Sequence, residues 1–404
     1  MGITLFKKSG TGFILGHVPA LSRQEIIRTL AHENIDFKEV LATREVFLIE
    51  TNSQLNVKEL QERLGGTVKI SKLQILSYKK DPNSNLQLTN NILELIVKRL
   101  KDLDIKDKKF QFGFSLYGNI DVKEFQKIGL TIKRWLKEKG VNSRLVVSKE
   151  KTLSSVIVKK ERLIESGADI VVIKDKDDYY LGYTVSIQGF EEYSQRDYGR
   201  PTRDDKSGML PPKLAKIMIN LSQTDSVGTI LDPFCGSGTI LQEALLLGYK
   251  NILGGDISQK AVAFAQNNLN WLKTKYGLDI SGVKIYQLDA KDLSMMIEQS
   301  SVDAIVTEPY LGPTQSSKLK AQNLISELSN LYIKSFQEFY KVLKPGGRAV
   351  IILPIINGQL MDILEQIKSI GFIVEPLSDE PRGSIVYSRE GQRVEREIFI
   401  FQKI

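Results

Sequence analysis

The sequence predicts an α/β protein with a doubly wound parallel sheet in its C-terminal half and two smaller α+β units before it. Three observations support this class. The chain has 404 residues, which exceeds the length at which one hydrophobic core usually stops growing. From Pro211 onward, short apolar segments alternate regularly with segments of helical period, as strand–helix–strand units do. Before Pro211 the alternation is shorter and less regular.

The two N-terminal units are expected at residues 1–78 and 79–188, followed by a polar linker at 189–208. Apolar runs bounded by turn residues are assigned to strands, and segments with a capping box or an apolar stripe are assigned to helices. The first unit then has strands at 13–15 and 46–49, a helix opened by Ser22 and Glu25, and a helix through 60–64 that ends at Gly65-Gly66. The second has helices at 91–100 and 121–139 and strands at 111–117, 144–147, 154–158, 169–173 and 179–187.

The C-terminal unit is expected at residues 209–404. Its predicted parallel strands are 229–231, 252–254, 284–288, 304–306 and 349–353. Two more apolar segments, 384–387 and 397–401, flank a polar turn at 389–392. This pattern predicts a terminal antiparallel hairpin, which a purely parallel nucleotide-binding sheet lacks.

Cysteine and histidine are scarce. Cys235 is the single cysteine, and His17 and His32 are the only histidines, so we expect neither an internal disulfide nor a metal site. The N-terminus leads into no apolar core of signal-peptide length, and no run approaches the ~18 apolar residues of a membrane span. A cytoplasmic protein that contacts no membrane is therefore expected.

The net charge of +8 is unevenly distributed along the chain. Residues 1–200 carry 34 basic and 26 acidic side chains, whereas residues 201–404 carry 22 of each. Residues 51–150 alone hold 20 basic and 11 acidic groups. Such a regional excess attracts a polyanion, but lysine-rich helices also serve simply as solvated faces. Charge alone leaves both interpretations open.

A glycine turn follows the first strand of the C-terminal unit, in the segment Asp232-Pro233-Phe234-Cys235-Gly236-Ser237-Gly238-Thr239. Glycines let the backbone approach a ligand, and the start of the next helix favours an anion. Asp256 ends the next strand, where a carboxylate can hold both ribose hydroxyls of a nucleoside. Asp289 ends the third strand and could accept a hydrogen bond from an adenine amine. Together these strand-end acids predict one cofactor pocket.

The same residues allow two other interpretations, a nicotinamide-binding motif and a helix N-cap. A nicotinamide dehydrogenase would carry a third glycine where Ile240 stands, so S-adenosylmethionine is the better cofactor. Asp256 could instead be an ordinary helix N-cap.

Further motifs point to one family. Thr307-Glu308-Pro309-Tyr310 ends the fourth strand, and Arg196-Asp197-Tyr198-Gly199-Arg200-Pro201 precedes the glycine turn, as does the stretch 208–221. The segment from Asp232 to Thr239 resembles the first cofactor motif of amino-group methyltransferases. The set as a whole resembles the tRNA guanine-N2 methyltransferases that carry a THUMP domain, in the group that acts on guanosine ten.

The resemblance implies a Rossmann-like methyltransferase fold and assigns site residues. The implied cofactor-binding residues are Asp232, Phe234, Gly236, Gly238, Thr239, Asp256, Ile257, Asp289 and Ala290. The implied catalytic residues are Thr307, Glu308, Pro309 and Tyr310. In front, residues 11–75 resemble the ferredoxin-like domain of the family and 85–187 resemble its THUMP domain, which binds the acceptor end of tRNA. The implied partners are tRNA and, as in some relatives, a small activator subunit.

The sequence departs from the family pattern in the motif that the resemblance assigns to catalysis. Where the family has Asp or Asn before Pro-Pro-Tyr, this chain has Thr307, and Glu308 stands where a proline is usual. A nucleobase amine is a poor nucleophile, because its lone pair is delocalised, so hydrogen-bond acceptors must localise it. We expect Glu308 to be the acceptor and Tyr310 to stack on the base. Cys235 lies inside the cofactor loop, which argues against a cytosine-C5 mechanism.

Other functions stay open from the sequence. The same chemistry could act on another tRNA position or on ribosomal RNA, and adenine-N6 methylation is a more distant alternative. The altered motif at Thr307 also leaves open a catalytically silent RNA-binding protein.

Overall fold

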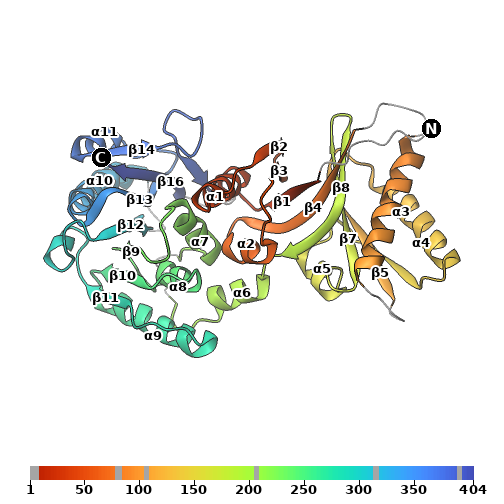
Figure 1. Ribbon diagram of the computed structural model, residues 1–404. Helices are drawn as coiled ribbons and strands as arrows, with labels where there is room; N and C mark the ends of the chain where they lie inside the picture. The colour runs from red at the N-terminus through yellow and green to blue at the C-terminus, as the bar shows by residue number, and fades with distance from the viewer. Residues whose placement is uncertain (1–8, 78–83, 104–108, 204–208, 313–317, 389–393) are drawn as a thin grey trace. The chain divides into compact units, whose positions relative to one another are not determined.

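The computed structural model describes residues 9–77, 84–103, 109–203, 209–312, 318–388 and 394–404 (Figure 1). The chain forms two compact units. The first comprises residues 1–19, 34–62 and 67–190, and the second comprises 20–33, 63–66 and 191–404. Two short pieces of the N-terminal region therefore belong to the same unit as the C-terminal half.

Within the described residues, the first unit is built on one mixed, eight-stranded sheet. In sheet order its strands are β2 (Lys38–Ala42), β3 (Val46–Glu50), β1 (Ser9–Leu15), β4 (Thr67–Ser77), β8 (Asp178–Ile187), β7 (Gly167–Asp175), β5 (Phe110–Gly118) and β6 (Ser143–Val146). Strand β5 runs parallel to β6 and β7, and the other pairs are antiparallel. The long pairing of β4 with β8 joins the strands of both predicted N-terminal domains into a single sheet. Strands β2 and β4 were not assigned from the sequence.

The helices of this region are α1 (Pro19–His32), α2 (Val57–Arg63), α3 (Ser84–Asp102), α4 (Val122–Glu138) and α5 (Ser155–Lys160). Helices α3 and α4 bury their apolar stripes against the sheet, with Ile96 and Ile132 fully buried beside Phe112. Asp121 caps α4 by accepting a hydrogen bond from the Lys123 amide, at the position where the sequence predicted the helix to begin.

Two local predictions in this region are wrong. Residues 154–158 were expected as a strand because of their β-branched side chains, but they begin helix α5. The Ser154 hydroxyl accepts a hydrogen bond from the Ile157 amide, and this N-cap outweighs a weak propensity. Helix α1 begins at Pro19 rather than at Ser22, because proline is favoured in the first turn.

A buried polar network crosses the first sheet. The Lys69 ammonium lies 2.8 Å from Asp169 Oδ2 and donates to the Ser115 hydroxyl at 3.2 Å. Asp169 also accepts hydrogen bonds from the hydroxyls of Ser115 and Thr184, each at 2.6 Å. Removing either charge would leave the other buried and unpaired. The network therefore fixes how β4, β5, β7 and β8 align.

The second unit is a doubly wound sheet. Within the described residues its strand order is β11 (Val283–Gln287), β10 (Asn251–Asp256), β9 (Thr229–Asp232), β12 (Val302–Thr307), β13 (Leu343–Ile356), β16 (Val394–Lys403) and β14 (Phe372–Glu375). Strands β9 to β13 are parallel, and β16 is antiparallel to β13, β14 and β15 (Ile385–Tyr387). The predicted parallel strands and the β15–β16 pairing are confirmed, and β14 is an additional strand. The turn predicted at 389–392 lies outside the described residues.

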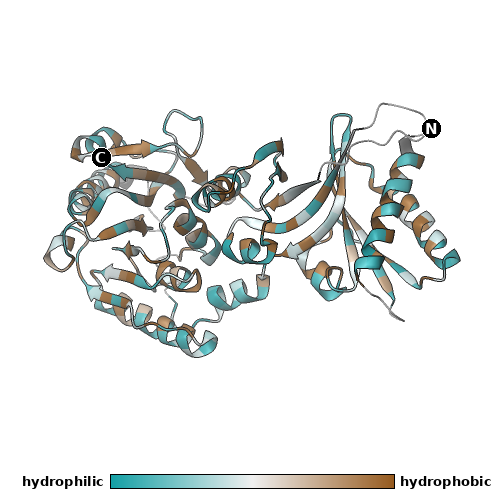
Figure 2. Ribbon diagram, in the orientation of Figure 1, coloured by the Kyte–Doolittle hydropathy of each residue, from teal (hydrophilic) through white to brown (hydrophobic). Residues whose placement is uncertain are grey.

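Helices cover both faces of this sheet (Figure 1). They are α6 (Phe190–Tyr198), α7 (Pro212–Leu221), α8 (Thr239–Leu246), α9 (Gln259–Tyr276), the 3₁₀ turn η1 (Leu293–Met295), α10 (Lys318–Val342) and α11 (Leu364–Ile370). Phe336 and Phe339 of α10 meet Phe372 and Phe401 of the sheet in one aromatic core. Figure 2 shows the corresponding apolar strands in brown and the outer helix faces in teal.

Residues 189–208, expected as a linker, contain helix α6. Arg196 of this helix pairs with Glu243 of α8 at 2.5 Å, and both side chains are almost fully buried. The Arg196 guanidinium also stacks on the Tyr193 ring, 4.5 Å from its centroid. Helix α6 is thereby fixed to the second unit.

Glu25 of α1 is fully buried in the second unit. Its carboxylate accepts hydrogen bonds from the amides of Gly65 and Gly66, each at 2.8 Å, and from the Asn220 side chain of α7 at 2.7 Å. A Cβ on Gly65 would lie 2.4 Å from the Lys213 carbonyl oxygen, so only glycine allows this packing. Burial raises the pKa of Glu25 to about 7 despite these hydrogen bonds.

Candidate active site

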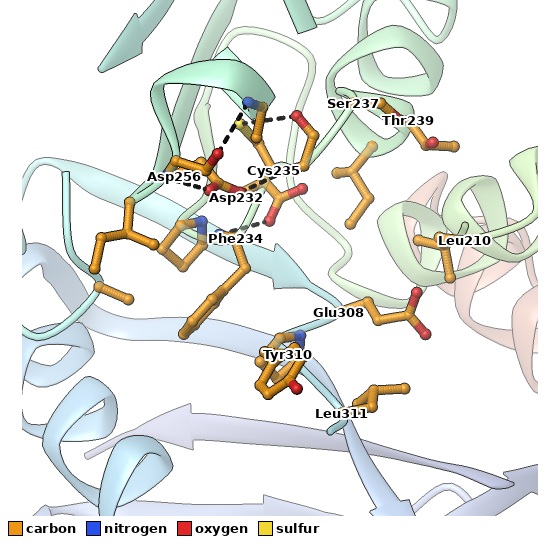
Figure 3. Close-up of a pocket in the computed structure, with 18 of the residues that line it drawn as sticks. Leu210, Asp232, Phe234, Cys235, Ser237, Thr239, Asp256, Glu308, Tyr310 and Leu311 are labelled. Carbon is orange, nitrogen blue, oxygen red and sulfur yellow. Dashed lines mark hydrogen bonds between the residues drawn. The ribbon is translucent and has the colours of Figure 1, made fainter. Parts of the chain in front are cut away.

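A cavity of about 510 Å³ lies where strands β9, β10, β11 and β12 end (Figure 3), the usual place for ligands in an open α/β sheet. Its lining includes most of the residues predicted to bind the cofactor: Asp232, Phe234, Gly236, Thr239, Asp256, Ile257, Asp289 and Ala290. It also includes three of the predicted catalytic residues, Glu308, Pro309 and Tyr310. Gly238 and Thr307 do not line it.

The two loop glycines have different roles. Gly236 has a φ of 51° and Gly238 a φ of 82°. These are left-handed backbone conformations, which residues with a Cβ rarely adopt. A Cβ on Gly236 would meet no atom within 4 Å, so this residue keeps the cavity open. A Cβ on Gly238 would lie 3.2 Å from Ala265 Cα. Gly238 therefore lets α8 and α9 pack closely, behind the surface that a ligand could touch.

Asp256, at the end of β10, holds the glycine loop in place. Its Oδ2 accepts a hydrogen bond from the Gly236 amide at 2.9 Å, and its Oδ1 accepts one from the Ser258 amide at 2.8 Å. The N-cap of α9 is Ser258, not Asp256, since the Ser258 hydroxyl accepts from the Ala261 amide. A carboxylate has about four acceptor sites. Asp256 thus keeps capacity for ligand hydroxyls.

Asp289 follows β11 on the same edge of the sheet. Its Oδ1 accepts a hydrogen bond from the Lys291 amide at 3.0 Å, and its Oδ2 lies 3.1 Å from the Lys291 ammonium. The side chains of Ile257 and Phe264 also line the cavity. This edge can take a flat, amine-bearing ring between apolar side chains, with one carboxylate at its rim.

Asp232 is the buried acid at the base of the cavity. Its Oδ1 accepts hydrogen bonds from the Thr307 hydroxyl at 2.7 Å and from the Phe234 amide at 3.2 Å. Its Oδ2 has no hydrogen-bond partner in the described part of the chain. Burial, together with the nearby carboxylates of Asp256 and Glu308, raises the pKa of Asp232 to about 7, although the hydrogen bonds from Thr307 and Phe234 lower it. The Asp232 carboxyl can therefore form an ion pair with a positively charged ligand group in the cavity.

The fourth strand ends with residues of opposite orientation. Thr307 is fully buried, and its hydroxyl is committed to Asp232. Glu308 lines the cavity and pairs with Arg396 of β16, with 2.5 Å between Glu308 Oε1 and Arg396 Nε. Tyr310 is 54% exposed, and its backbone oxygen accepts a hydrogen bond from the Tyr332 hydroxyl. Figure 3 shows Glu308 and Tyr310 across the cavity from Asp232 and Asp256.

Among the site residues that were not predicted from the sequence, three make contacts that organise the site. Arg396 lines the cavity from a strand 88 residues away from Glu308. Asn268 of α9 is fully buried and donates to the backbone oxygens of Ser237 and Thr202, which ties the glycine loop to the preceding segment. Arg200 donates to the Thr239 hydroxyl at 2.7 Å, at the start of α8. Arg200 belongs to the Arg196–Pro201 motif that carries the family resemblance, and this contact ties the motif to the start of α8.

Cys235 is a packing residue. It is buried, and burial together with the nearby carboxylates of Asp232 and Asp256 raises the pKa of its thiol well above the usual value. A thiol that stays protonated is a poor nucleophile. The expectation that Cys235 does not attack a substrate agrees with this environment.

The described residues were searched for metal sites and for membrane-spanning helices. They contain no group of three or more histidine, cysteine, aspartate or glutamate side chains that could hold a metal ion. None of the helices in the same ranges is long and apolar enough to cross a membrane.

A second hollow, of about 830 Å³, lies in the first unit beside the C-terminal half of α4. Lys133, Arg134 and Lys137 line it together with Leu130 and the turn at 140–143. Its lining contains three cations and no acid among the described residues. We call this hollow the α4 groove.

Comparison with known proteins identifies families and relatives that match parts of the chain. Residues 200–366 match the family described as "RMKL-like, methyltransferase domain", and residues 78–267 match one described as "DNA methylase". The tRNA (guanine(10)-N2)-dimethyltransferase of Methanothermobacter thermautotrophicus is 36% identical over 40% of this chain and 46% of its own length. The protein of the same name from Pyrococcus abyssi is 32% identical over 45% of this chain and 46% of its own length. The chain thus spans about half the length of these curated relatives.

Solved structures resemble the whole chain. TrmN from Thermus thermophilus matches with a TM-score of 0.59 at 18% identity, over 98% of this chain and all of that one (100%). SMU.472, solved in complex with SAH, matches with a TM-score of 0.52 at 12% identity, over 98% of both chains. At these identities the likeness establishes the fold.

The fold is that of Rossmann-like methyltransferases, and the cavity lies where such a sheet binds its ligand. A narrower assignment comes from a relative that this chain covers more fully. The "Probable tRNA (guanine(10)-N2)-dimethyltransferase" of Methanothermococcus thermolithotrophicus is 32% identical over 74% of its length and 30% of this chain. The chain belongs to the tRNA guanine-N2 methyltransferase family.

Proposed function

We propose that this protein transfers a methyl group from S-adenosylmethionine to the exocyclic N2 amine of a guanosine in tRNA, at position ten. One observation carries the proposal: a single cavity joins a glycine loop with strand-end carboxylates to Glu308 and Tyr310. The names of the relatives that act on guanine ten support the same substrate. We place this activity in the cytoplasm.

The residues present suit the cofactor. Asp256 would hold the ribose hydroxyls, Asp289 the adenine amine, and the free oxygen of Asp232 the ammonium group. Gly236 leaves the space that a Cβ would fill. When bound, S-adenosylmethionine supplies a methyl group activated by a sulfonium.

The substrate side of the cavity suits an amine. A guanine in a stem must leave the base stack before its amine can enter. Tyr310, exposed at the rim, would stack on the base, and Glu308 would accept hydrogen bonds from the amine and so localise its lone pair. Thr307 is fully buried and does not line the cavity, so its hydroxyl oxygen is not placed to accept from the amine.

The first unit would bind the RNA. It contains most of the proposed ferredoxin-like domain at 1–78 and the proposed THUMP domain at 79–188, and the sequence places an excess of basic residues in this part of the chain. The α4 groove offers cationic side chains that can contact phosphates, and Leu130 adds an apolar side chain to its lining. A small activator subunit is a further proposed partner, from the family resemblance alone.

The direct test is nucleoside mass spectrometry of tRNA from a strain that lacks the gene. Loss of N2-methylguanosine at position ten is expected. Loss at another position would move the target, as in the mouse relative named tRNA (guanine(6)-N(2))-methyltransferase THUMP3. Unchanged tRNA, together with no S-adenosylmethionine binding in calorimetry, would instead identify a silent RNA-binding protein.

A further inference from the structure

Arg396 and Glu308 form an ion pair inside the proposed active-site cavity. Arg396 lies on β16 between β13 and β15, opposite Pro354 on one side and Tyr387 on the other, so its backbone is held by two neighbouring strands. The side chains of Arg396 and Glu308 are 12% and 13% exposed. Both line the cavity that must receive the base.

The pair leaves polar atoms of both partners unused. Only Arg396 Nε bonds to Glu308, through Oε1 at 2.5 Å. Arg396 Nη1 and Nη2 and Glu308 Oε2 have no hydrogen-bond partner within the ranges that the structure describes. A guanidinium carries five N–H donors, and a carboxylate has about four acceptor sites. The cavity wall therefore presents donors directly beside acceptors.

Other arginines of the second unit are used more fully. Arg382 bonds to Glu397 through both Nε and Nη2, and also to the Met361 carbonyl. Arg348 approaches Glu375 through Nε and Nη2, at 3.0 and 2.9 Å. These arginines make the two-nitrogen contacts of structural ion pairs. Arg396 differs because it makes a single contact and lines a cavity.

We propose that Arg396 and Glu308 together read the Watson–Crick edge of guanine, with Arg396 as the specificity-determining residue. In that edge an acceptor, O6, stands beside two donors, N1–H and the N2 amine. Arg396 donates to O6, while Glu308 accepts from N1–H and from the amine that becomes methylated. This inference rests on the proposed function and names the residue that selects its base.

The same pair rejects adenine. Adenine places an amine where guanine has O6 and a lone pair where guanine has N1–H. The guanidinium would then face a donor and the carboxylate an acceptor, so both contacts become repulsive rather than absent. Sites built to hydrogen-bond a specific group reject analogues that leave their polar atoms unpaired by large factors.

The test uses a tRNA transcript in which the target guanosine, mapped first with the wild-type protein, is replaced by 2,6-diaminopurine. This base keeps the N2 amine but replaces O6 with an amine and removes the N1 proton. The measured quantity is the ratio of kcat/KM for N2 methylation of guanosine to that of 2,6-diaminopurine. We expect a ratio of about 100 or more for the wild type and a fall of about 10-fold or more in Arg396→Met.

Arg348→Met is the matched control, because it also breaks an ion pair of this sheet but lies outside the cavity lining. Its ratio should equal that of the wild type. Arg396→Lys keeps a charged donor group but loses the planar guanidinium, so it should give an intermediate ratio, which provides a second reading if Arg396→Met does not fold.

The outcomes separate the two claims. A wild-type protein that methylates no guanosine overturns the proposed function. A wild-type protein that methylates guanosine, with an unchanged ratio in the folded Arg396 variants, overturns the role of Arg396 alone. Lower rates at an unchanged ratio would make Arg396 a purely structural partner of Glu308.

Discussion

At the scale of single residues, Asp232 combines deep burial with a place in the lining of the proposed cofactor cavity. It is 2% exposed and accepts two hydrogen bonds, yet its pKa is raised from 3.8 to about 7. Because the folded pKa lies above the unfolded one, its contribution to stability is fully present below about pH 4 and is lost as the pH rises through about 7. A cationic ligand group reverses this preference, since it favours the ionised carboxylate.

The affinity for S-adenosylmethionine should therefore increase between pH 5.5 and 7.5, by up to about tenfold per pH unit below the pKa. Above about pH 8 the α-amino group of the cofactor loses its own proton. Asp232→Asn should remove this pH dependence and weaken binding at pH 7.5 by about 10- to 100-fold. Calorimetry across the pH range measures both effects.

Glu25→Gln is the matched control for this titration. Glu25 is also a fully buried carboxyl of the second unit with a pKa of about 7, and it does not line the cavity. Its variant should change the pH dependence of stability but not that of cofactor affinity. An equal effect of both substitutions on affinity would show that Asp232 acts through general stability only.

Substitutions of Glu308 and Thr307 should affect different properties of the protein, turnover for Glu308 and stability for Thr307. Glu308→Gln should lower the turnover number strongly with little change in tRNA affinity, because the amide accepts through one oxygen and carries no charge. Thr307→Ala should instead cost about 1 to 2 kcal/mol of stability by removing the donor to Asp232, with a smaller loss of turnover. Single-turnover methylation and urea unfolding separate the two. A larger catalytic loss in Thr307→Ala would make the threonine the acceptor.

At the scale of elements, the ends of the parallel strands could be predicted from the sequence. Asp256 and Asp289 fall at the predicted edge, because parallel strands of an alternating pattern end on the same side of their sheet. The pairing of Arg396 with Glu308 was not readable. It depends on the β16 register, which brings together residues 88 positions apart. Helix α5 was missed because its short β-branched sequence fits a strand equally well.

Helix α4 offers a matched test of RNA binding. Lys133→Glu/Lys137→Glu changes two exposed lysines of the α4 groove, whereas Lys123→Glu/Lys127→Glu changes two exposed lysines of the first half of the helix. Both changes alter the net charge equally. The groove variant should weaken tRNA binding more and reduce its salt dependence, by a slope of about 0.7 to 0.9 per lost phosphate contact. If filter binding shows the same loss of tRNA affinity in both variants, the groove lysines act only through the net charge of the protein.

At the scale of the whole chain, the order of α+β and doubly wound regions was predictable, because strand-like and helical segments alternate regularly only from Pro211 onward. The composition of the units was not. Helix α1 and residues 63–66 belong to the second unit, through hydrogen bonds of Glu25 to Gly65, Gly66 and Asn220. A capping box and a pair of glycines carry no sign of such long-range partners.

The central claim is that the cavity of the second unit methylates the N2 amine of a tRNA guanosine. Its most direct test incubates the purified protein and its Tyr310→Ala variant with S-adenosylmethionine and unmodified tRNA, and identifies the product nucleoside by mass spectrometry. The wild type should yield N2-methylguanosine, and Tyr310→Ala should lose most of this activity while it still binds the cofactor. A product methylated on adenine or cytosine, or full activity in Tyr310→Ala, would contradict the account.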